Sequence, residues 1–248
     1  MNTADSVFFY TIHKCASTLF GGYVLKNMKG LRHVDYAGLL YGGAFVDSVN
    51  FDDKGFVYGP IRVSAHPDSP VYRRLVVPTT CTDFVRDRKA MFMIRDPRDV
   101  LVSQYYSFGG SHLISLVPEI ARQQLRDRKD IQTRTIDEYV LDCVNTTLGH
   151  FELIARLSDA CRQAVVLRYE DMISDWPQFV RSLSRFADFE DSVLSQIYAQ
   201  TRPRESMDIS SHRRSGQTGQ FRDHLEPATV RAVNKILMPV LERHHYNP

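Results

Sequence analysis

A lysine and two hydroxyl side chains follow an apolar run near the N-terminus. The run covers residues 7–12, and the chain continues His13-Lys14-Cys15-Ala16-Ser17-Thr18. A turn from a strand into a helix presents free backbone N–H groups and the positive end of the helix dipole. Lys14 would add a point charge there, and Ser17 and Thr18 would add hydroxyl donors. These donors predict a site for a tetrahedral oxyanion; the alternative is a solvated Lys14 and a Ser17 that only caps the helix.

This loop differs from the phosphate loop of NTPases. The glycines of the G-x-x-x-x-G-K-[ST] pattern are missing, and Lys14 precedes the hydroxyl pair by three residues. The difference counts against an NTPase or a kinase.

A second cluster begins at Arg95, which ends an apolar run over residues 90–94. Ser103 follows eight positions later, about two turns into a predicted helix. An arginine at a strand end can make a planar, bidentate contact with a phosphate, and a serine adds a neutral hydrogen bond. The pair therefore indicates a second phosphate site; the alternative is an ion pair of Arg95 with Asp96 or Asp99.

Two further polar clusters come late in the chain. Tyr169-Glu170-Asp171 follows a third apolar run, and residues 213–222 form a basic stretch that contains Gly216 and Gly219. Glycines in a basic loop allow the backbone to approach a phosphate closely. An ordinary solvated loop is the alternative for this stretch.

Strands and helices must position these clusters. The apolar runs predict buried strands at residues 7–12, 90–94 and 164–169. Helical spacing predicts helices at residues 17 to about 29, after Asp96, and at 135–160, 176–187, 191–199 and 227–244. Asp96 as N-cap, Pro97 as first helical residue and Asp99 reaching back define the start of the second helix. Residues 111–134 read as a charged surface excursion or lid, and residues 201–224 as a polar loop.

Alternating strands and helices predict an α/β fold with a central, mostly parallel sheet flanked by helices on both faces. In such sheets the ligand binds at the C-terminal ends of the strands, where the polar clusters fall. At 248 residues the chain is expected to form a single domain over residues 1–248.

Composition excludes several classes of function. The formal net charge of +2 carries no signal for binding nucleic acid. No apolar run approaches the length of a membrane span, and no secretory leader opens the chain, so we expect a cytoplasmic protein that does not bind membranes. The cysteines (Cys15, Cys81, Cys143 and Cys161) are widely spaced, which indicates reduced thiols and no metal site.

Four elements, in this order, resemble sulfotransferases that use 3′-phosphoadenosine 5′-phosphosulfate (PAPS), of the cytosolic and bacterial small-molecule type. The His13–Thr18 loop is similar to their 5′-phosphosulfate loop, and Arg95 to Ser103, within R-D-P-R-D-V-L-V-S, to their 3′-phosphate motif. Leu167-Arg168-Tyr169-Glu170-Asp171 is similar to their late-strand tyrosine motif. Arg214-Ser215-Gly216-x-x-Gly219-x-Phe221-Arg222 resembles their C-terminal glycine loop. The resemblance implies a P-loop-like three-layer fold.

The resemblance also implies roles for individual residues. Lys14 would contact the bridging oxygen and the transferring sulfonate, and so offset charge on the leaving phosphate. The His13–Thr18 loop would bind the 5′-phosphate. A second group of residues would bind the 3′-phosphate and so select PAPS over ATP-like donors. The donor-binding residues implied are Cys15, Ala16, Ser17, Thr18, Leu19, Arg95, Ser103, Tyr169, Thr201, Arg214, Ser215 and Gly216. PAPS is the donor, 3′-phosphoadenosine 5′-phosphate (PAP) the product, and no metal is implied.

The sequence departs from the family pattern at two places. Leu19 stands where the small-molecule branch often has an aromatic side chain, so stacking on the base is in doubt there. The strand that carries a catalytic histidine in that branch corresponds to residues 57–62, which contain none. His66 follows shortly after and is our candidate general base, with His33 and Asp35 as rivals.

The acceptor is a hydroxyl or amine of a small molecule on this interpretation. Residues 31–59 are rich in aromatic side chains and mostly acidic in charge, which would suit an aromatic or cationic acceptor; core packing is the alternative for those aromatics. Another nucleotide-dependent transferase, such as a small-molecule kinase, and a catalytically silent nucleotide-binding module are the competing functions. The sequence leaves the oligomeric state open.

Overall fold

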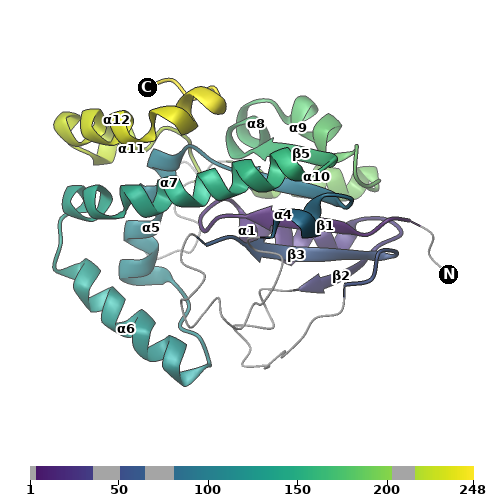
Figure 1. Cartoon of the computed structure of the whole chain (residues 1–248), viewed down its shortest axis with the longest axis horizontal. Helices are drawn as coiled ribbons and strands as arrows, with labels where there is room; N and C mark the ends of the chain where they lie inside the picture. The colour runs from purple at the N-terminus through teal and green to yellow at the C-terminus, as the bar shows by residue number, and fades with distance from the viewer. Residues whose placement is uncertain (1–3, 36–50, 65–80, 203–215) are drawn as a thin grey trace.

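The structure, a computed structural model, describes residues 4–35, 51–64, 81–202 and 216–248. Five strands form one sheet in the order β2-β3-β1-β4-β5, and every described pair is parallel (Figure 1). The strands are β1 (Val7–Thr11), β2 (Arg32–Asp35), β3 (Phe56–Arg62), β4 (Lys89–Ile94) and β5 (Gln163–Arg168). The predicted parallel α/β sheet is confirmed.

The central strands are apolar on both faces. All five residues of β1 are buried, and Phe8 and Phe9 point to opposite faces because successive side chains alternate along a strand. Phe9 stacks on Phe20, with 4.3 Å between ring centroids, whereas Phe8 meets Phe84 edge-on at 5.2 Å. Aromatic pairs of this kind add about 0.5–1.5 kcal/mol each beyond the area that they bury. Helical segments therefore cover both faces, as the three-layer prediction requires.

The first face carries the segment that follows β1. This segment runs as α1 (Ser17–Leu19), a π-helix η1 (Phe20–Val24) and a 3₁₀ turn η2 (Leu25–Asn27), not as one α-helix to residue 29. Gly21 allows its close approach to β3, since a Cβ there would lie 2.7 Å from Cδ of Pro60. The same face is covered by α8 (Tyr169–Ser174), α9 (Trp176–Leu183) and α10 (Asp191–Thr201).

The second face carries α4 (Thr82–Val85) and the long helix α7 (Ile136–Ala160), which crosses the front of the sheet in Figure 1. Thr135 caps α7 with a complete capping box to Glu138, which explains why the predicted start is correct. α5 (Pro97–Tyr106), α11 (Phe221–His224) and α12 (Pro227–Arg243) pack with α7 around a second apolar cluster.

Several predicted boundaries are wrong. The expected excursion at residues 111–134 contains α6 (Pro118–Gln132), which follows a second π-helix, η3 (Ser107–Ser111). α9 ends at Leu183, and α10 extends to Thr201. The predicted polar loop to residue 224 contains α11 at its end. β2, α4 and α8 were not predicted, because they are short and β2 is polar.

Two properties of the whole chain bear on function. No helix in the described ranges is long and apolar enough to span a bilayer. Cys15, Cys81, Cys143 and Cys161 are all free thiols. The division of residues 1–248 into a single domain stays a prediction.

Candidate active site

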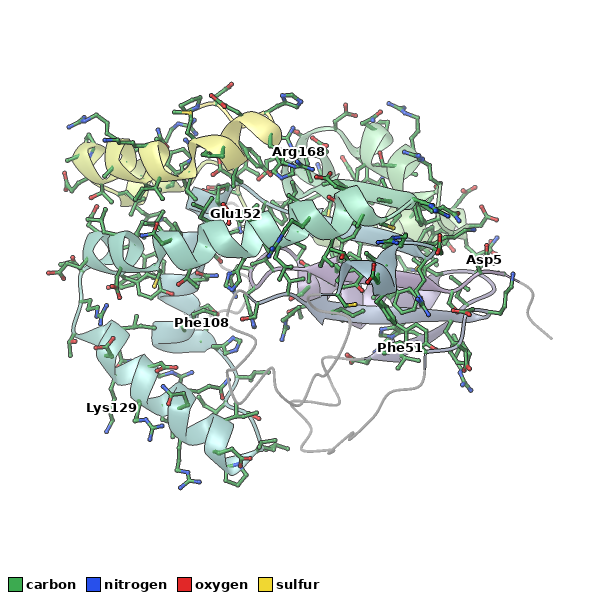
Figure 2. The ribbon with its side chains drawn as sticks, viewed as in Figure 1. Asp5, Phe51, Phe108, Lys129, Glu152 and Arg168 are labelled. Carbon is green, nitrogen blue, oxygen red and sulfur yellow. The ribbon has the colours of Figure 1, made fainter. Side chains whose placement is uncertain are left out.

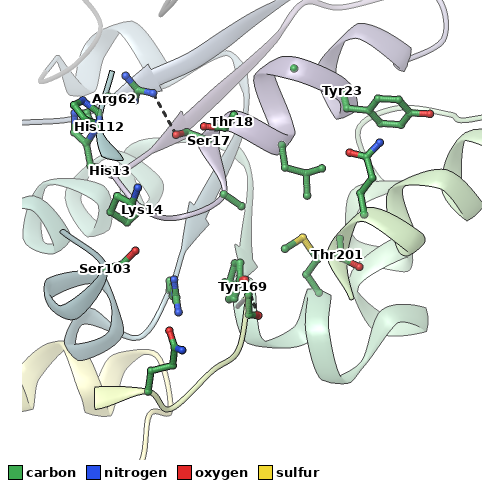
Figure 3. A pocket seen from close by; sticks show the side chains of 18 residues that line it. His13, Lys14, Ser17, Thr18, Tyr23, Arg62, Ser103, His112, Tyr169 and Thr201 are labelled. Atoms are coloured by element: carbon green, nitrogen blue, oxygen red, sulfur yellow. Dashed lines mark hydrogen bonds between the residues drawn. The ribbon is translucent and has the colours of Figure 1, made fainter. Parts of the chain in front are cut away.

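A cavity of about 420 Å³ lies at the C-terminal ends of the parallel strands, where a ligand is expected in such a sheet (Figure 3). Its walls come from the loop after β1, the ends of β3 and β4, and helices α5, α8 and α10. The residues that line it are His13, Lys14, Ala16, Ser17, Thr18, Leu19, Gly22, Tyr23, Arg62, Arg95, Ser103, His112, Tyr169, Met172, Gln200, Thr201, Gly216 and Gln220.

The loop after β1 has an unusual backbone. Lys14 and Ala16 both have positive φ, 73° and 58°, in the left-handed region that L-residues rarely adopt. Thr11 holds the loop down: its hydroxyl donates to the carbonyl oxygens of Cys15 at 3.3 Å and Met93 at 3.2 Å. Such a tightly turned loop before a helix directs several backbone N–H groups into one concavity, which suits an anion.

Lys14, Ser17 and Thr18 lie together on this loop at the cavity wall, as predicted. Lys14 Nζ donates a hydrogen bond to Ser107 Oγ at 2.9 Å, which fixes the ammonium group against η3. Ser17 is the first residue of α1 and is buried. The side chain of Cys15 does not line the cavity: it is buried below the loop, and burial raises the pKa of its thiol to about 12.

Arg62 is a second cation at this end of the cavity. It ends β3, and its guanidinium NH2 donates to Ser17 Oγ at 3.3 Å (Figure 3). In the sequence, this strand stood out only for the histidine that it lacks. An arginine that ends a strand was the available signal, the same signal that identified Arg95.

Arg95 also lines the cavity, directly after the C-terminal end of β4. Its guanidinium NH2 donates to the carbonyl oxygen of Gln217 at 2.9 Å and contacts Asp99 Oδ2 at 3.5 Å. Its Cζ lies over the ring of Tyr169, 4.5 Å from the ring centroid. Burial acts to lower the pKa of Arg95, but Asp99, Tyr169, Glu170 and Cys15 together outweigh it, so this pKa lies above its ordinary value. Ser103 lines the cavity from α5, as predicted.

The start of α5 differs from the prediction in one respect. Asp96 is the N-cap, accepting from Arg98 N at 3.0 Å, and Pro97 follows it, as expected. Asp99 does not reach back to the cap. Its carboxylate instead accepts from two backbone N–H groups of the late glycine loop, Gly219 at 2.7 Å and Phe221 at 3.0 Å.

Tyr169 and Thr201 line the cavity on the side away from Lys14 (Figure 3), and Gly216 lines it as well. The hydroxyl of Tyr169 donates to the carbonyl oxygen of Gly216 at 2.8 Å, which ties α8 to the late loop. Gly216 has a φ of 75°, so this turn of the loop favours glycine. Leu19 also lines the cavity and presents an aliphatic surface where an aromatic one is common in the family resembled.

Three predicted site residues, His66, Arg214 and Ser215, lie outside the described residues. The rival bases, His33 and Asp35, are on the edge strand β2 and do not line the cavity. His33 Nε2 lies 2.8 Å from the carbonyl oxygen of Gly59.

The aromatic side chains expected at the acceptor pocket are core residues where the structure describes them. Phe51, Phe56 and Tyr58 contact one another or Phe8 in a single aromatic cluster and do not line the cavity. Figure 2 shows Phe51 at the end of the sheet near Asp5, which precedes β1. Tyr36, Tyr41 and Phe45 lie outside the described residues.

Two histidines at the cavity wall were missed as candidates. His13 precedes Lys14, and His112 follows η3; their ring centroids lie 6.0 Å apart. Burial, followed by the positive charges of Arg62, His112, Lys14 and His150, lowers the pKa of His13 well below 6.5. The type and position of His13 were visible in the sequence, but nothing there indicated that it would face the cavity.

No group of three or more His, Cys, Asp or Glu side chains that could hold a metal ion occurs in the part of the chain that the structure describes. The donors at the cavity are cations, hydroxyls and backbone amides, which suit an anionic ligand.

Comparisons with known proteins agree with the site. The sequence profile of the sulfotransferase domain matches residues 83–244, well over half of the chain. No curated protein sequence matches. The fold is similar to that of mouse sulfotransferase SULT7A1 complexed with PAP: the TM-score is 0.60 at 13% identity, over 96% of this chain and 84% of the mouse chain.

Two crystal structures of retinol dehydratase are also similar in fold. One contains androsterone and the inactive cofactor PAP, with a TM-score of 0.56 at 17% identity over 95% of this chain and 80% of the other. The second contains retinol and PAP, with a TM-score of 0.55 at 16% identity over 96% and 82%. The P-loop-like α/β fold implied by the four motifs is therefore confirmed, and the matched domain shows that the chain belongs to the sulfotransferase family.

Proposed function

We propose that this chain transfers a sulfonate group from PAPS to a hydroxyl or amine of a small molecule by in-line displacement. One observation carries the proposal: anion-binding side chains from two parts of the fold line a single cavity. We assign Lys14, Ser17 and Arg62, from the loop after β1 and the end of β3, to one group, and Arg95 and Ser103, from the end of β4 and from α5, to the other. A nucleotide with phosphates on both its 5′ and 3′ positions matches two such groups.

The 5′-phosphosulfate binds to the loop after β1. The backbone N–H groups of the loop and the hydroxyls of Ser17 and Thr18 hold the 5′-phosphate. Arg62 reaches the same oxygens, since it already contacts Ser17 Oγ. Lys14 contacts the oxygen that bridges phosphorus and sulfur.

The 3′-phosphate binds to Arg95, Ser103 and the backbone of Gly216, and Arg214 and Ser215 complete this group. Arg95 suits the task because its guanidinium is buried, always charged and already oriented by Asp99. This second group gives selectivity for PAPS over ATP, which has no 3′-phosphate. Tyr169, Thr201 and Leu19 contact the adenosine part between the two groups.

The transfer step needs charge stabilisation more than covalent catalysis. As the sulfur–oxygen bond to the 5′-phosphate opens, negative charge grows on the leaving phosphate, and Lys14 and Arg62 offset it. In kinases Mg²⁺ supplies part of this stabilisation; here we assign it to protein cations.

The acceptor is a small molecule. Retinol and androsterone, bound to a protein of similar fold, support this class in general terms. An aromatic or cationic acceptor stays a prediction, which a panel of acceptors would test, because the aromatic side chains that suggested it are core residues where the structure describes them.

Two measurements test the function. The first is binding of PAP with EDTA present, with ATP–Mg²⁺ as the comparison; a kinase-like protein would prefer ATP–Mg²⁺. The second is transfer from labelled PAPS to a panel of alcohols, phenols and amines, for the wild type and Lys14→Ala. We expect the variant to lose about 10²–10³-fold in kcat, as when one transition-state donor is removed.

The outcomes separate the rival functions. Equal transfer by wild type and Lys14→Ala would show that Lys14 has no part in the reaction. Tight PAP binding without transfer to any acceptor class would favour the silent binding module.

A further inference from the structure

We propose that His13 is the general base that removes the proton from the acceptor. The proposal rests on the proposed function, because it assigns a role at the same site. Residues 57–62 lack the strand histidine of the small-molecule branch, and the sequence candidate His66 lies outside the described residues, whereas His13 and His112 line the cavity.

The position of His13 follows from that of Lys14. The two residues are neighbours on the loop after β1, and both line the cavity. Tyr169 and Thr201 lie on the nucleoside side, whereas His13, His112 and Arg62 lie on the far side of Lys14 (Figure 3). A donor whose bridging oxygen contacts Lys14 therefore directs its sulfonate toward His13, and the acceptor must approach from that end.

A fixed cluster of rings holds His13 in place. Its ring lies edge-on to Phe108, with centroids 5.7 Å apart, and to His112, at 6.0 Å. Phe108 and His112 are themselves 5.0 Å apart. Both come from the turn η3 and the residue after it, so one short segment forms the wall opposite His13.

The same segment also fixes Lys14. Ser107 at the start of η3 accepts from Lys14 Nζ at 2.9 Å, and its carbonyl oxygen accepts from His112 N at 2.7 Å. Arg128 of α6 donates to the carbonyl oxygens of Phe108 and His112 and braces the segment from outside. The cation for the leaving group and the imidazole for the acceptor thus share one rigid support.

Burial and the charges around His13 keep its imidazole neutral in the absence of donor. The charged and titratable groups that face it are Lys14 on its own loop, Arg62 of β3, His112 after η3 and His150 of α7. Burial and these groups together lower the pKa of His13 well below 6.5 in the absence of donor. The donor brings negative charge next to Lys14 and Arg62, which offsets their effect and raises the pKa of His13 toward the value of a useful base.

With an alcohol acceptor, the acceptor oxygen forms a bond to sulfur while the bond from sulfur to the 5′-phosphate oxygen breaks, and that electron pair stays on the phosphate of PAP. The acceptor proton moves to a ring nitrogen of His13. The imidazolium then releases this proton to solvent, and sulfated acceptor and PAP leave.

The experiment compares single histidine variants. His13→Asn is tested beside His66→Asn, the rival base, and His245→Asn, an exposed control outside the cavity whose positive φ of 55° asparagine tolerates. Each variant is measured for PAP affinity, kcat with one acceptor, and thermal unfolding. We expect His13→Asn to lose at least about 10²-fold in kcat, as for a general base, while PAP affinity changes little.

A second measurement uses the wild type and so does not depend on how the variant folds. Histidine NMR titrations with and without PAP should give a higher pKa for His13 in the PAP complex. A loss of kcat in His66→Asn but not in His13→Asn, or a His13 resonance that does not respond to PAP, would overturn the proposal. Failure of the wild type to bind PAP or to transfer sulfonate would instead contradict the proposed function.

Discussion

Asp99 on α5 accepts a hydrogen bond from the backbone N–H of Gly219 at 2.7 Å, although 120 positions separate the two residues. The Asp99 side chain is fully buried, and it also accepts from Phe221 N and contacts Arg95. One carboxylate therefore joins the arginine assigned to the 3′-phosphate and the glycine loop assigned to the same phosphate. Arg95 NH2 also donates a hydrogen bond to the carbonyl oxygen of Gln217 in the glycine loop.

This arrangement predicts a double effect for Asp99→Asn. The amide oxygen can accept from one backbone N–H, but its NH₂ group faces the other donor, and the charge that pairs with Arg95 is lost. We expect destabilisation of about 3–5 kcal/mol, as for the removal of one partner of a buried ion pair. PAP affinity should fall at least tenfold, since each 1.4 kcal/mol of lost binding energy is about tenfold. Thermal unfolding and calorimetric PAP titration measure the two effects.

The matched control is Asp142→Asn, which breaks an exposed ion pair with Arg134. Exposed pairs contribute about 0.2–1 kcal/mol, so this variant should stay near the wild type in stability and equal it in PAP affinity. If Asp99→Asn bound PAP as tightly as Asp142→Asn does, the glycine loop would have no part in the 3′-phosphate site.

Arg62 and Arg95 are predicted to recognise different ends of the nucleotide. Arg62→Gln should weaken the binding of PAP and of adenosine 5′-monophosphate about tenfold or more, as for one lost charge-assisted hydrogen bond. The affinity for adenosine 3′-monophosphate should stay unchanged. Arg95→Gln should weaken the binding of PAP and of adenosine 3′-monophosphate and leave that of adenosine 5′-monophosphate unchanged. Arg86→Gln, at an exposed ion pair outside the cavity, is the control and should bind all three ligands like the wild type.

Affinities of the three ligands for the three variants decide the matter. If Arg62→Gln and Arg95→Gln weakened both monophosphates equally, the cavity would not contain two separate phosphate groups. The assignment of a donor phosphorylated at both positions would then lose its main support.

The sequence predicted the parts of the fold and site that depend on local patterns. The apolar runs of β1, β4 and β5 and the capping box of α7 are local signals, and the cavity does lie where these strands end, although β5 is only partly buried. The loop residues Lys14, Ser17 and Thr18 reach it because they directly follow β1.

The sequence could not show contacts between distant segments. Asp99 looked like a helix cap because its local spacing allowed it, and its link to Gly219 exists only once α5 and the late loop meet. His13 and His112 come from distant segments that meet at one wall, so neither was recognised. Phe51 and Tyr58 looked like pocket residues because burial in the core and in a pocket favour the same side chains.

Replacement of Ala16 by glycine should stabilise the folded protein. Its φ of 58° is left-handed, which costs an L-residue about 1–2 kcal/mol, whereas glycine adopts it freely at a smaller cost in chain entropy. We expect Ala16→Gly to gain up to about 1 kcal/mol in the free energy of unfolding. Ala199→Gly, on the exposed face of α10, is the opposite control and should lose up to about 1 kcal/mol. A loss for both variants in denaturant unfolding would show that the loop does not strain Ala16.

The buried imidazole of His244 should make the free energy of unfolding depend on pH. Burial, followed by the positive charges of Arg243, Arg168 and His245, lowers its pKa to about 4 in the folded protein. The unfolded chain takes up a proton near pH 6.5, so it binds more protons than the folded state between pH 6.5 and 4. The stability that His244 contributes is therefore complete above pH 6.5 and is lost as the pH falls through this window. The loss is on the order of 3 kcal/mol by linkage, at about 1.4 kcal/mol for each pH unit between 6.5 and 4.

His244→Gln removes the titrating group and should flatten the curve of unfolding free energy against pH between 6.5 and 4. His245→Asn, at the exposed neighbouring position, keeps the buried imidazole and removes only the smallest of the charges that lower its pKa, so it should retain most of the slope of the wild type. Urea unfolding at half-unit pH steps compares the three proteins. Because the effect comes from one proton, the wild type and His244→Gln should differ in slope by at most about 1.4 kcal/mol per pH unit. Equal slopes for these two proteins would mean that His244 is protonated in the folded state and that its burial does not prevent this.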